Sequence, residues 1–117
     1  MKLRIVSDSI RLRLKQAEVK ALVEGRDVVE TCRTAPVPLV YTLRPDSEAE
    51  NLTAVSNGSV LTISIPSAWL GGWDADDRVG FTSNDRGIVL LIEKDWKCTN
   101  PTSPADNEDC FENPVCQ

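Results

Sequence analysis

The four cysteines are the side chains best suited to chemistry in this sequence, because the chain contains no histidine. Cys98, Cys110 and Cys116 lie in the last 22 residues, with 11 and 5 residues between them, and Cys32 lies far upstream. Structural zinc sites usually contain closer pairs, such as C-x2-C. Three interpretations follow: a metal site that combines the thiols, a disulfide between Cys110 and Cys116, and unpaired thiols that pack as small apolar groups.

Enzymatic chemistry has few candidate residues. A cysteine or serine nucleophile normally needs a histidine base, and none is present. Glu93, Lys94 and Asp95 could supply acid–base groups, but strand alternation would place Lys94 on the face opposite the two carboxylates. Gly71-Gly72 lacks the spacing of a phosphate-binding loop. The sequence therefore favours a protein without catalytic residues or cofactors.

A row of cations near the start is the other concentrated feature. Arg4, Arg11 and Arg13 share one face of two predicted strands, with Lys2 and Lys15 nearby. Such a row can be the solvated outer face of a half-covered sheet. It can also receive carboxylates, which arginine binds through two parallel hydrogen bonds. The partner would then be an acidic peptide, a small anion, or the acids of the chain's own tail, Asp106, Glu108, Asp109 and Glu112.

Charge is divided unevenly along the chain. The formal net charge is -5, but residues 1–33 carry eight Lys and Arg against five Asp and Glu, a balance of +3 that leaves -8 for the rest. Nucleic-acid binding needs a cationic surface that releases counterions, so this acidic body argues against it. The opening residues alternate as a strand does, without the apolar run of a secretory leader or a membrane span. We therefore expect a cytoplasmic protein that binds neither nucleic acid nor membrane.

Eight segments are predicted as strands from alternating polarity or β-branched content. They are residues 2–6, 9–14, 26–33, 37–44, 51–55, 59–65, 78–82 and 87–94. Turns are predicted at Ser7-Asp8, at Asn57-Gly58 and at residues 83–86. Asn57-Gly58 fits a type I′ turn, because both residues tolerate a positive φ. The chain therefore contains at least three predicted hairpins.

Prolines and apolar runs predict where some of these strands lie. Residues 26–33 and 37–44 are expected at exposed edges, the second because Pro38 cannot donate a ladder hydrogen bond. Pro45 is expected to start a turn. The continuous apolar run of residues 88–92 predicts a central strand that is covered on both faces.

Two short helices are predicted, over residues 15–24 and 66–73. The first should end at Gly25 and be poorly capped, because Lys15 stands where Ser or Thr would pair with Glu18. The combined pattern ββαββββαββ predicts a single α+β domain with a curled, mainly antiparallel sheet of about eight strands. The core would span residues 1–95, followed by an irregular, acidic, cysteine-containing tail, residues 96–117, docked on the core.

Three segments resemble a family of small bacterial proteins without an assigned activity. Residues 1–19 are similar to that family's M-K-I-R-I-x-x-N-S-[IL]-R-L-R-L-[ST]-x-x-E-V, residues 91–98 to its L-[VL]-E-K-D-[FW]-x-C, and residues 106–114 to its D-x-x-D-x-F-x-N-P. At the polar positions of the first pattern, the chain departs at Asp8 and Lys15. The resemblance implies a bacterial cytoplasmic protein and marks these positions for testing: Ser9, Arg11, Arg13, Glu93, Lys94, Asp95, Cys98, Phe111, Asn113 and Pro114.

The sequence as a whole predicts a small binding protein that contacts its partner through the arginine hairpin and the tail. The candidate binding residues are Ser9, Arg11, Arg13, Glu93, Lys94, Asp95, Phe111 and Asn113. The alternative is a metal-binding or redox-responsive protein that uses Cys98, Cys110 and Cys116, with Cys32 as a fourth ligand. A further alternative, an enzyme, would need the carboxylates of Glu93 and Asp95 buried together in a cleft.

Overall fold

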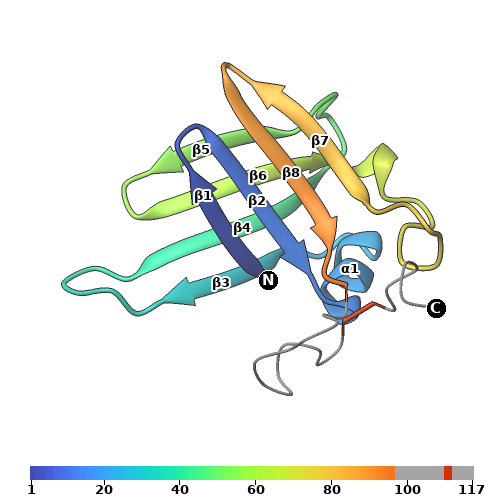
Figure 1. The fold of residues 1–117 in the computed structure, drawn as a ribbon, viewed down its shortest axis with the longest axis horizontal. Helices are drawn as coiled ribbons and strands as arrows, with labels where there is room; N and C mark the ends of the chain where they lie inside the picture. The colour runs from blue at the N-terminus through green and yellow to red at the C-terminus, as the bar shows by residue number, and fades with distance from the viewer. Residues whose placement is uncertain (97–109, 112–117) are drawn as a thin grey trace.

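Strands dominate the computed structural model, which describes residues 1–96 and 110–111 and contains two four-stranded sheets within them. The elements in chain order are β1 (Lys2–Val6), β2 (Ser9–Leu14), α1 (Gln16–Val23), β3 (Val28–Cys32), β4 (Leu39–Asp46), β5 (Thr53–Asn57), β6 (Val60–Pro66), the 3-10 turn η1 (Ser67–Trp69), β7 (Gly80–Asp85) and β8 (Ile88–Lys94). The first sheet has the order β1-β2-β8-β7 and the second β3-β4-β6-β5. Figure 1 shows them stacked as two layers whose strands cross.

Each sheet joins two hairpins through a parallel central pair. β2 runs parallel to β8 and β4 runs parallel to β6, whereas the outer pairs are antiparallel. The first sheet is made from the two ends of the described chain and the second from its middle. The α+β class is confirmed, but the prediction of one curled, mainly antiparallel sheet is wrong. Alternation along a strand shows which side chains are buried, and it does not show which distant strand lies alongside.

Two of the hairpin turns differ from their predictions. In the β5–β6 hairpin the turn residues are Gly58 and Ser59, and only Gly58 has a positive φ, of 60°, as in a type II′ turn. In the β7–β8 hairpin the strand continues to Asp85, so the turn consists of Arg86 and Gly87 with φ of 52° and 91°. The polar residues 83–85 belong to β7 because the Arg86-Gly87 pair supplies the positive φ values that a type I′ turn requires.

Several strand placements also require correction. β4 is an interior strand and not an edge, and Pro45 lies within it, beyond the last residue that pairs with β3, where no neighbour on that side needs its N–H. β8 is central, as expected, but its outer face is open because Val89 is 38% exposed. The second predicted helix, residues 66–73, is reduced to η1, so α1 is the one α-helix in the described part of the chain.

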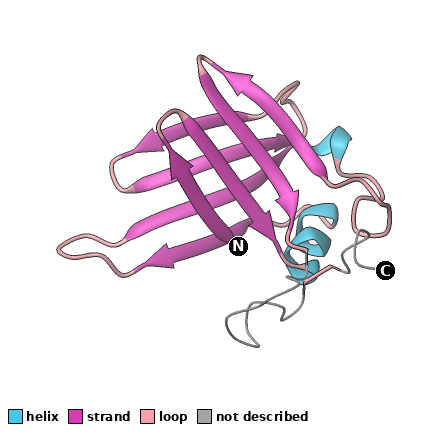
Figure 2. Cartoon of the chain, in the orientation of Figure 1, coloured by secondary structure: helices cyan, strands magenta, loops and turns pink. Residues whose placement is uncertain are grey.

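The core lies between the two sheets, and α1 closes one end of it (Figure 2). Its largest fully buried side chains include Leu12, Leu14, Leu22, Leu43, Ile63, Trp73, Leu90 and Ile92. Glu18 accepts a hydrogen bond from the Lys15 backbone N–H at 2.9 Å, so the carboxylate half of a capping box forms although Lys15 cannot supply the other half. Within the described residues no helix has the length and apolar character needed to span a membrane.

Candidate functional site

The arginine face consists of the outward side chains of the β1–β2 hairpin: Lys2 and Arg4 on β1, and Arg11 and Arg13 on β2. In the antiparallel register Arg4 lies directly opposite Arg11, and Lys2 lies directly opposite Arg13. Residues opposite one another have Cα atoms about 4.5–5.5 Å apart, so like charges at such positions destabilise a sheet. The hairpin therefore holds two opposed cation pairs side by side, and one member of each pair, Arg11 or Lys2, is bound to a carboxylate.

Glu93 balances part of this positive charge. β8 runs alongside β2, and Glu93 Oε1 lies 3.0 Å from Arg11 Nε. Within residues 1–96 and 110–111, no carboxylate lies within ion-pair distance of Arg4 or Arg13. Both of these arginines are exposed. Their guanidinium groups can therefore receive carboxylates from outside the described chain.

A shallow groove of about 220 Å³ lies on the arginine face. It is lined by Arg4, Val6, Ser9 and Arg11. The two guanidinium groups supply donors and the Ser9 hydroxyl can donate or accept, so the groove suits a carboxylate. Of the predicted binding residues, Ser9 and Arg11 thus lie together, Arg13 lies further along the same strand, and Glu93 borders them through its ion pair with Arg11.

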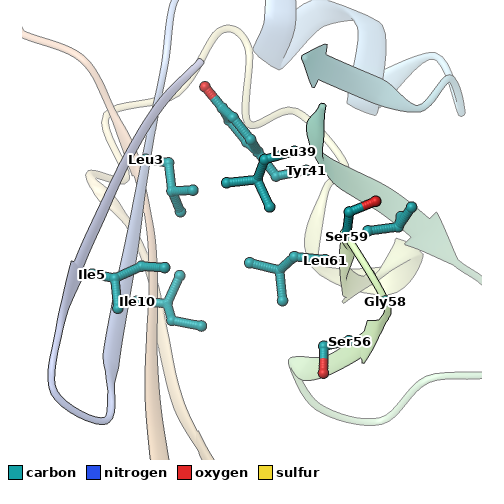
Figure 3. Close-up of a pocket in the computed structure, with 10 residues that line it drawn as sticks. Leu3, Ile5, Ile10, Leu39, Tyr41, Ser56, Gly58, Ser59 and Leu61 are labelled. Atoms are coloured by element: carbon teal, nitrogen blue, oxygen red, sulfur yellow. The ribbon is translucent and has the colours of Figure 1, made fainter. Parts of the chain in front are cut away.

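An apolar cavity of about 230 Å³ lies on the other side of the same hairpin, between the two sheets. Side chains from β1, β2, β4 and β6 line it, among them Leu3, Ile5, Ile10, Leu39, Tyr41 and Leu61. In Figure 3 the side chains from the hairpin face those of the second sheet across the cavity, beside the β5–β6 turn. The cavity opens to solvent, because Ile5 is 55% exposed and Leu39 is 38% exposed. The hairpin therefore separates a cationic groove from an apolar cavity.

Lys94 points away from the arginine face and into the core. Its side chain is 1% exposed, and its Nζ donates a hydrogen bond of 2.6 Å to the backbone carbonyl of Asp76. The ammonium also lies 5.0 Å from the ring centroid of Phe111 and 5.8 Å from that of Trp73. Asp76 Oδ1 lies 3.7 Å from the same Nζ, so a carbonyl, a carboxylate and two aromatic faces together balance this buried cation. Lys94 is thus placed to hold the end of β8 and Phe111 together.

Asp95 is buried beside the arginine face. Its Oδ2 lies 3.0 Å from Lys2 Nζ, and its side chain is 3% exposed. Next to it, Cys110 is 1% exposed. Burial and then the negative charge of Asp95 raise the pKa of the Cys110 thiol. A thiol with a raised pKa is a poor nucleophile and a poor metal ligand at neutral pH, so this pair supports packing rather than reactivity.

The described part of the tail, residues 110–111, lies against α1 and the end of β8. Gln16 Nε2 donates a hydrogen bond of 2.9 Å to the carbonyl of Cys110, and the Phe111 N–H donates one of 2.9 Å to the carbonyl of Asp95. The rings of Trp96 and Phe111 meet edge to face with centroids 5.7 Å apart. The remaining tail predictions fall outside the described residues: Cys98, Asp106, Glu108, Asp109, Glu112, Asn113, Pro114 and Cys116.

The described cysteines do not assemble a metal site. Cys32 is exposed at the end of β3, whereas Cys110 is buried and its carbonyl accepts a hydrogen bond from Gln16 at the start of α1. Residues 1–96 and 110–111 contain no cluster of three Cys, Asp or Glu that could bind a metal ion. The disulfide predicted between Cys110 and Cys116 involves a residue beyond the described ranges.

The proposed enzyme centre is likewise not assembled from its three predicted residues. Glu93 is bound to Arg11 on the outer face, Lys94 enters the core, and Asp95 is bound to Lys2. The cavity residues were absent from the predicted binding set, and Arg4 was predicted only as a member of the cation row and not as a binding residue. The signal for Arg4 was present in the sequence, because a hairpin turn at Ser7-Asp8 places it opposite Arg11. The cavity depends on packing between sheets, for which the sequence carries no local signal.

A family model matches residues 1–115 of the chain. The chain belongs to a family of unknown function, DUF7009. No curated protein and no solved structure matches it. Membership confirms the expectation of a family without an assigned function, and it assigns neither an activity nor a ligand. The function must therefore be argued from the geometry of the site.

Proposed function

We propose that the protein binds an acidic polypeptide segment of a partner protein through the arginine face. One observation carries this proposal: Arg4 faces Arg11 and Lys2 faces Arg13 across the hairpin. A carboxylate placed between two opposed cations relieves their repulsion and gains charge-assisted hydrogen bonds at the same time. Each opposed pair thus keeps one cation, Arg4 beside Arg11 or Arg13 beside Lys2, that has no carboxylate within ion-pair distance among the described residues and can gain one from a partner.

The surrounding charge supports an acidic polypeptide over a nucleic acid. The chain has a net charge of -5, so a nucleic acid approaching the arginine face also meets the repulsion of an acidic body. A peptide segment of a few residues covers only the hairpin and avoids that repulsion. The groove of about 220 Å³ beside Arg4, Ser9 and Arg11 has room for individual carboxylate side chains.

The test is the binding of a short fluorescein-labelled peptide of alternating Glu and Ser, followed by fluorescence anisotropy. A Lys-Ser peptide of equal length and a single-stranded oligonucleotide serve as competing ligands. The variant Arg4→Gln/Arg11→Gln removes two charges from the arginine face. The matched control is Arg26→Gln/Arg44→Gln, which removes two charges from exposed arginines away from that face.

We expect the Glu-Ser peptide to bind the natural protein at low salt, to bind the Arg4→Gln/Arg11→Gln variant about tenfold more weakly, and to bind the control variant normally. The affinity should fall as added salt shortens the screening length to about 8 Å at physiological ionic strength. Equal loss in both double variants would show that only overall charge matters. That result, or tighter binding of the oligonucleotide, would contradict the proposal.

A further inference from the structure

β1 is the outer strand of the first sheet and leaves one backbone edge without a strand partner in the described chain. The carbonyls of Asp8 and Leu14 accept hydrogen bonds from Val89 and Asp95, so the even-numbered residues of β2 bond towards β8. The odd-numbered residues of β2 therefore bond to β1, where they pair with Lys2, Arg4 and Val6. It follows that Leu3 and Ile5 direct their N–H and C=O groups outward.

The outward N–H and C=O groups of Leu3 and Ile5 form no backbone hydrogen bond with another segment of residues 1–96 or 110–111. The strand itself is exposed, with Ile5 at 55% and Val6 at 56% of their full accessible surface. A row of unpaired N–H and C=O groups on such an edge is a template for a further strand. Natural proteins protect edges with charged residues, and here Lys2 and Arg4 make the edge selective for an acidic strand.

The two faces of β1 differ in chemistry, so they would favour a partner strand whose residues alternate in type. Arg4 lines the cationic groove on the outer face, whereas Leu3 and Ile5 line the apolar cavity on the inner face (Figure 3). A strand paired with β1 would send successive side chains to opposite faces. Acidic side chains would then lie beside Lys2 and Arg4, the outward cations of β1, and apolar side chains would lie at the mouth of the cavity.

We infer that the acidic partner binds as an additional strand along the free edge of β1, with acidic and apolar residues in alternation. This inference rests on the proposed function and adds the backbone conformation and the apolar half of the recognised sequence. The occupant is a segment of another protein. A second copy of this chain is disfavoured, because pairing two β1 edges would bring Lys2 and Arg4 of one copy close to the same cations of the other.

The experiment compares three short peptides of equal charge on the full-length protein. The first alternates Glu and Val, the second alternates Glu and Ser, and the third is the Glu-Val peptide with N-methyl groups on every second amide. N-methylation removes ladder donors and keeps the charge and the side chains. The protein variants are Ile5→Thr at the cavity and, as a matched control, Val55→Thr, which is also exposed on an edge strand.

We expect the Glu-Val peptide to bind about fivefold or more tightly than the Glu-Ser peptide, because burial of one valine side chain is worth roughly that factor or more. The N-methylated peptide should lose about tenfold or more in affinity. Ile5→Thr should remove the advantage of Glu-Val over Glu-Ser, and Val55→Thr should keep it. Slower amide exchange at Leu3 and Ile5 in the complex would locate the added strand on this edge.

Other outcomes separate the failure of this inference from that of the proposed function. If all three peptides bind alike and all lose affinity in Arg4→Gln/Arg11→Gln, strand addition is overturned and acidic-partner binding stands. If the arginine variant has no effect, the proposed function fails as well. If the protein dimerises without peptide and Ile5→Thr prevents it, a second copy occupies the edge. If neutralising Asp106, Glu108 and Asp109 is required before any peptide binds, the occupant is the chain's own tail. Either of these last two results would contradict the inference that the occupant of the edge is a segment of another protein.

Discussion

Substituting Arg4 by Gln should stabilise the protein while weakening its binding. Arg4 faces Arg11 across the β1–β2 hairpin and has no carboxylate within ion-pair distance in the described chain. Arg11 is bound to Glu93 at 3.0 Å, so its removal would also break an ion pair. The substitution Arg4→Gln therefore removes the repulsion and leaves the ion pair in place, which makes Arg4 the informative member of the pair.

The expected gain follows from the separation of the two charges. Two unit charges at a separation of about 8 Å repel by about 0.5 kcal/mol in bulk water, or by about 2 kcal/mol at an effective dielectric constant of about 20. Measured cross-strand pairs fall in the range of about 0.2–1 kcal/mol. Because Arg4 is exposed, the free energy of unfolding should rise by about 0.5 kcal/mol, equivalent to about 2 °C in Tm for a chain of this size.

The assay is urea denaturation with thermal unfolding, each at low ionic strength and at about 1 M salt, where the screening length is about 3 Å. The gain from Arg4→Gln should be present at low salt and disappear at high salt. Arg44→Gln is the control, because Arg44 is exposed and lies 3.8 Å from Asp27, so its removal should give no gain. A loss of stability in Arg4→Gln at low salt, or a gain that persists at 1 M salt, would refute the reasoning that the opposed arginines are strained.

Three further predictions concern the packing around the site. Lys94→Met keeps most of the buried volume and loses the ammonium that binds the Asp76 carbonyl, so it should lower the free energy of unfolding by about 1–2 kcal/mol. Lys94→Ala also removes three buried methylenes, so it should lower that free energy by about 3–4 kcal/mol. Urea titration checks both, and a Met variant as stable as the natural protein would show that the ammonium contributes nothing. In the native protein iodoacetamide should modify the exposed Cys32 quickly and the buried Cys110 slowly, because burial and a nearby carboxylate raise the pKa of Cys110. Peptide mass spectrometry measures the modification of both sites, and equal rates in urea provide the control. A hydrogen bond from a backbone amide of β5 lowers the pKa of Asp85. The stabilisation from this carboxylate should be full above the ordinary carboxyl pKa and be lost as the pH falls through the lowered value. Asp85→Asn keeps an acceptor and should reduce the loss of stability at acid pH, and an unchanged loss would contradict the assignment.

Local patterns in the sequence predicted most strands, but they did not predict which distant strands pair with one another. The alternation of residues 2–6 and 9–14 was sufficient to predict the first hairpin and its buried face, and Gly58 located a second hairpin. The parallel pairs β2–β8 and β4–β6 have no comparable signal, because a strand's side-chain pattern is the same whichever neighbour it has. The apolar run 88–92 was predicted to be covered on both faces, and its outward members are instead partly exposed beside the arginine face.

For the candidate site, the sequence predicted the types of residue involved but only some of their positions. Arginine at alternate positions predicted a cationic face, and Ser9, Arg11 and Glu93 do gather there. Lys94 and Asp95 were included because they match the late motif of the family resemblance, but both are buried. Lys94 contacts Asp76, Trp73 and Phe111, and Asp95 contacts Lys2. Those partners lie far away along the chain, so no local spacing connects them.

The arrangement of the two sheets sets an order for synthesis of the chain. All four strands of the second sheet, β3 to β6, are translated in succession, so that sheet can pair before the chain is finished. Among the strands that the structure describes, β1 and β2 are translated before the others, yet β8, the parallel neighbour of β2, is translated after them. Contacts between such distant segments form slowly. A nascent chain therefore exposes both edges of the β1–β2 hairpin until β8 is translated, and β8 then covers one edge and leaves the edge on β1 without a strand partner among the described residues.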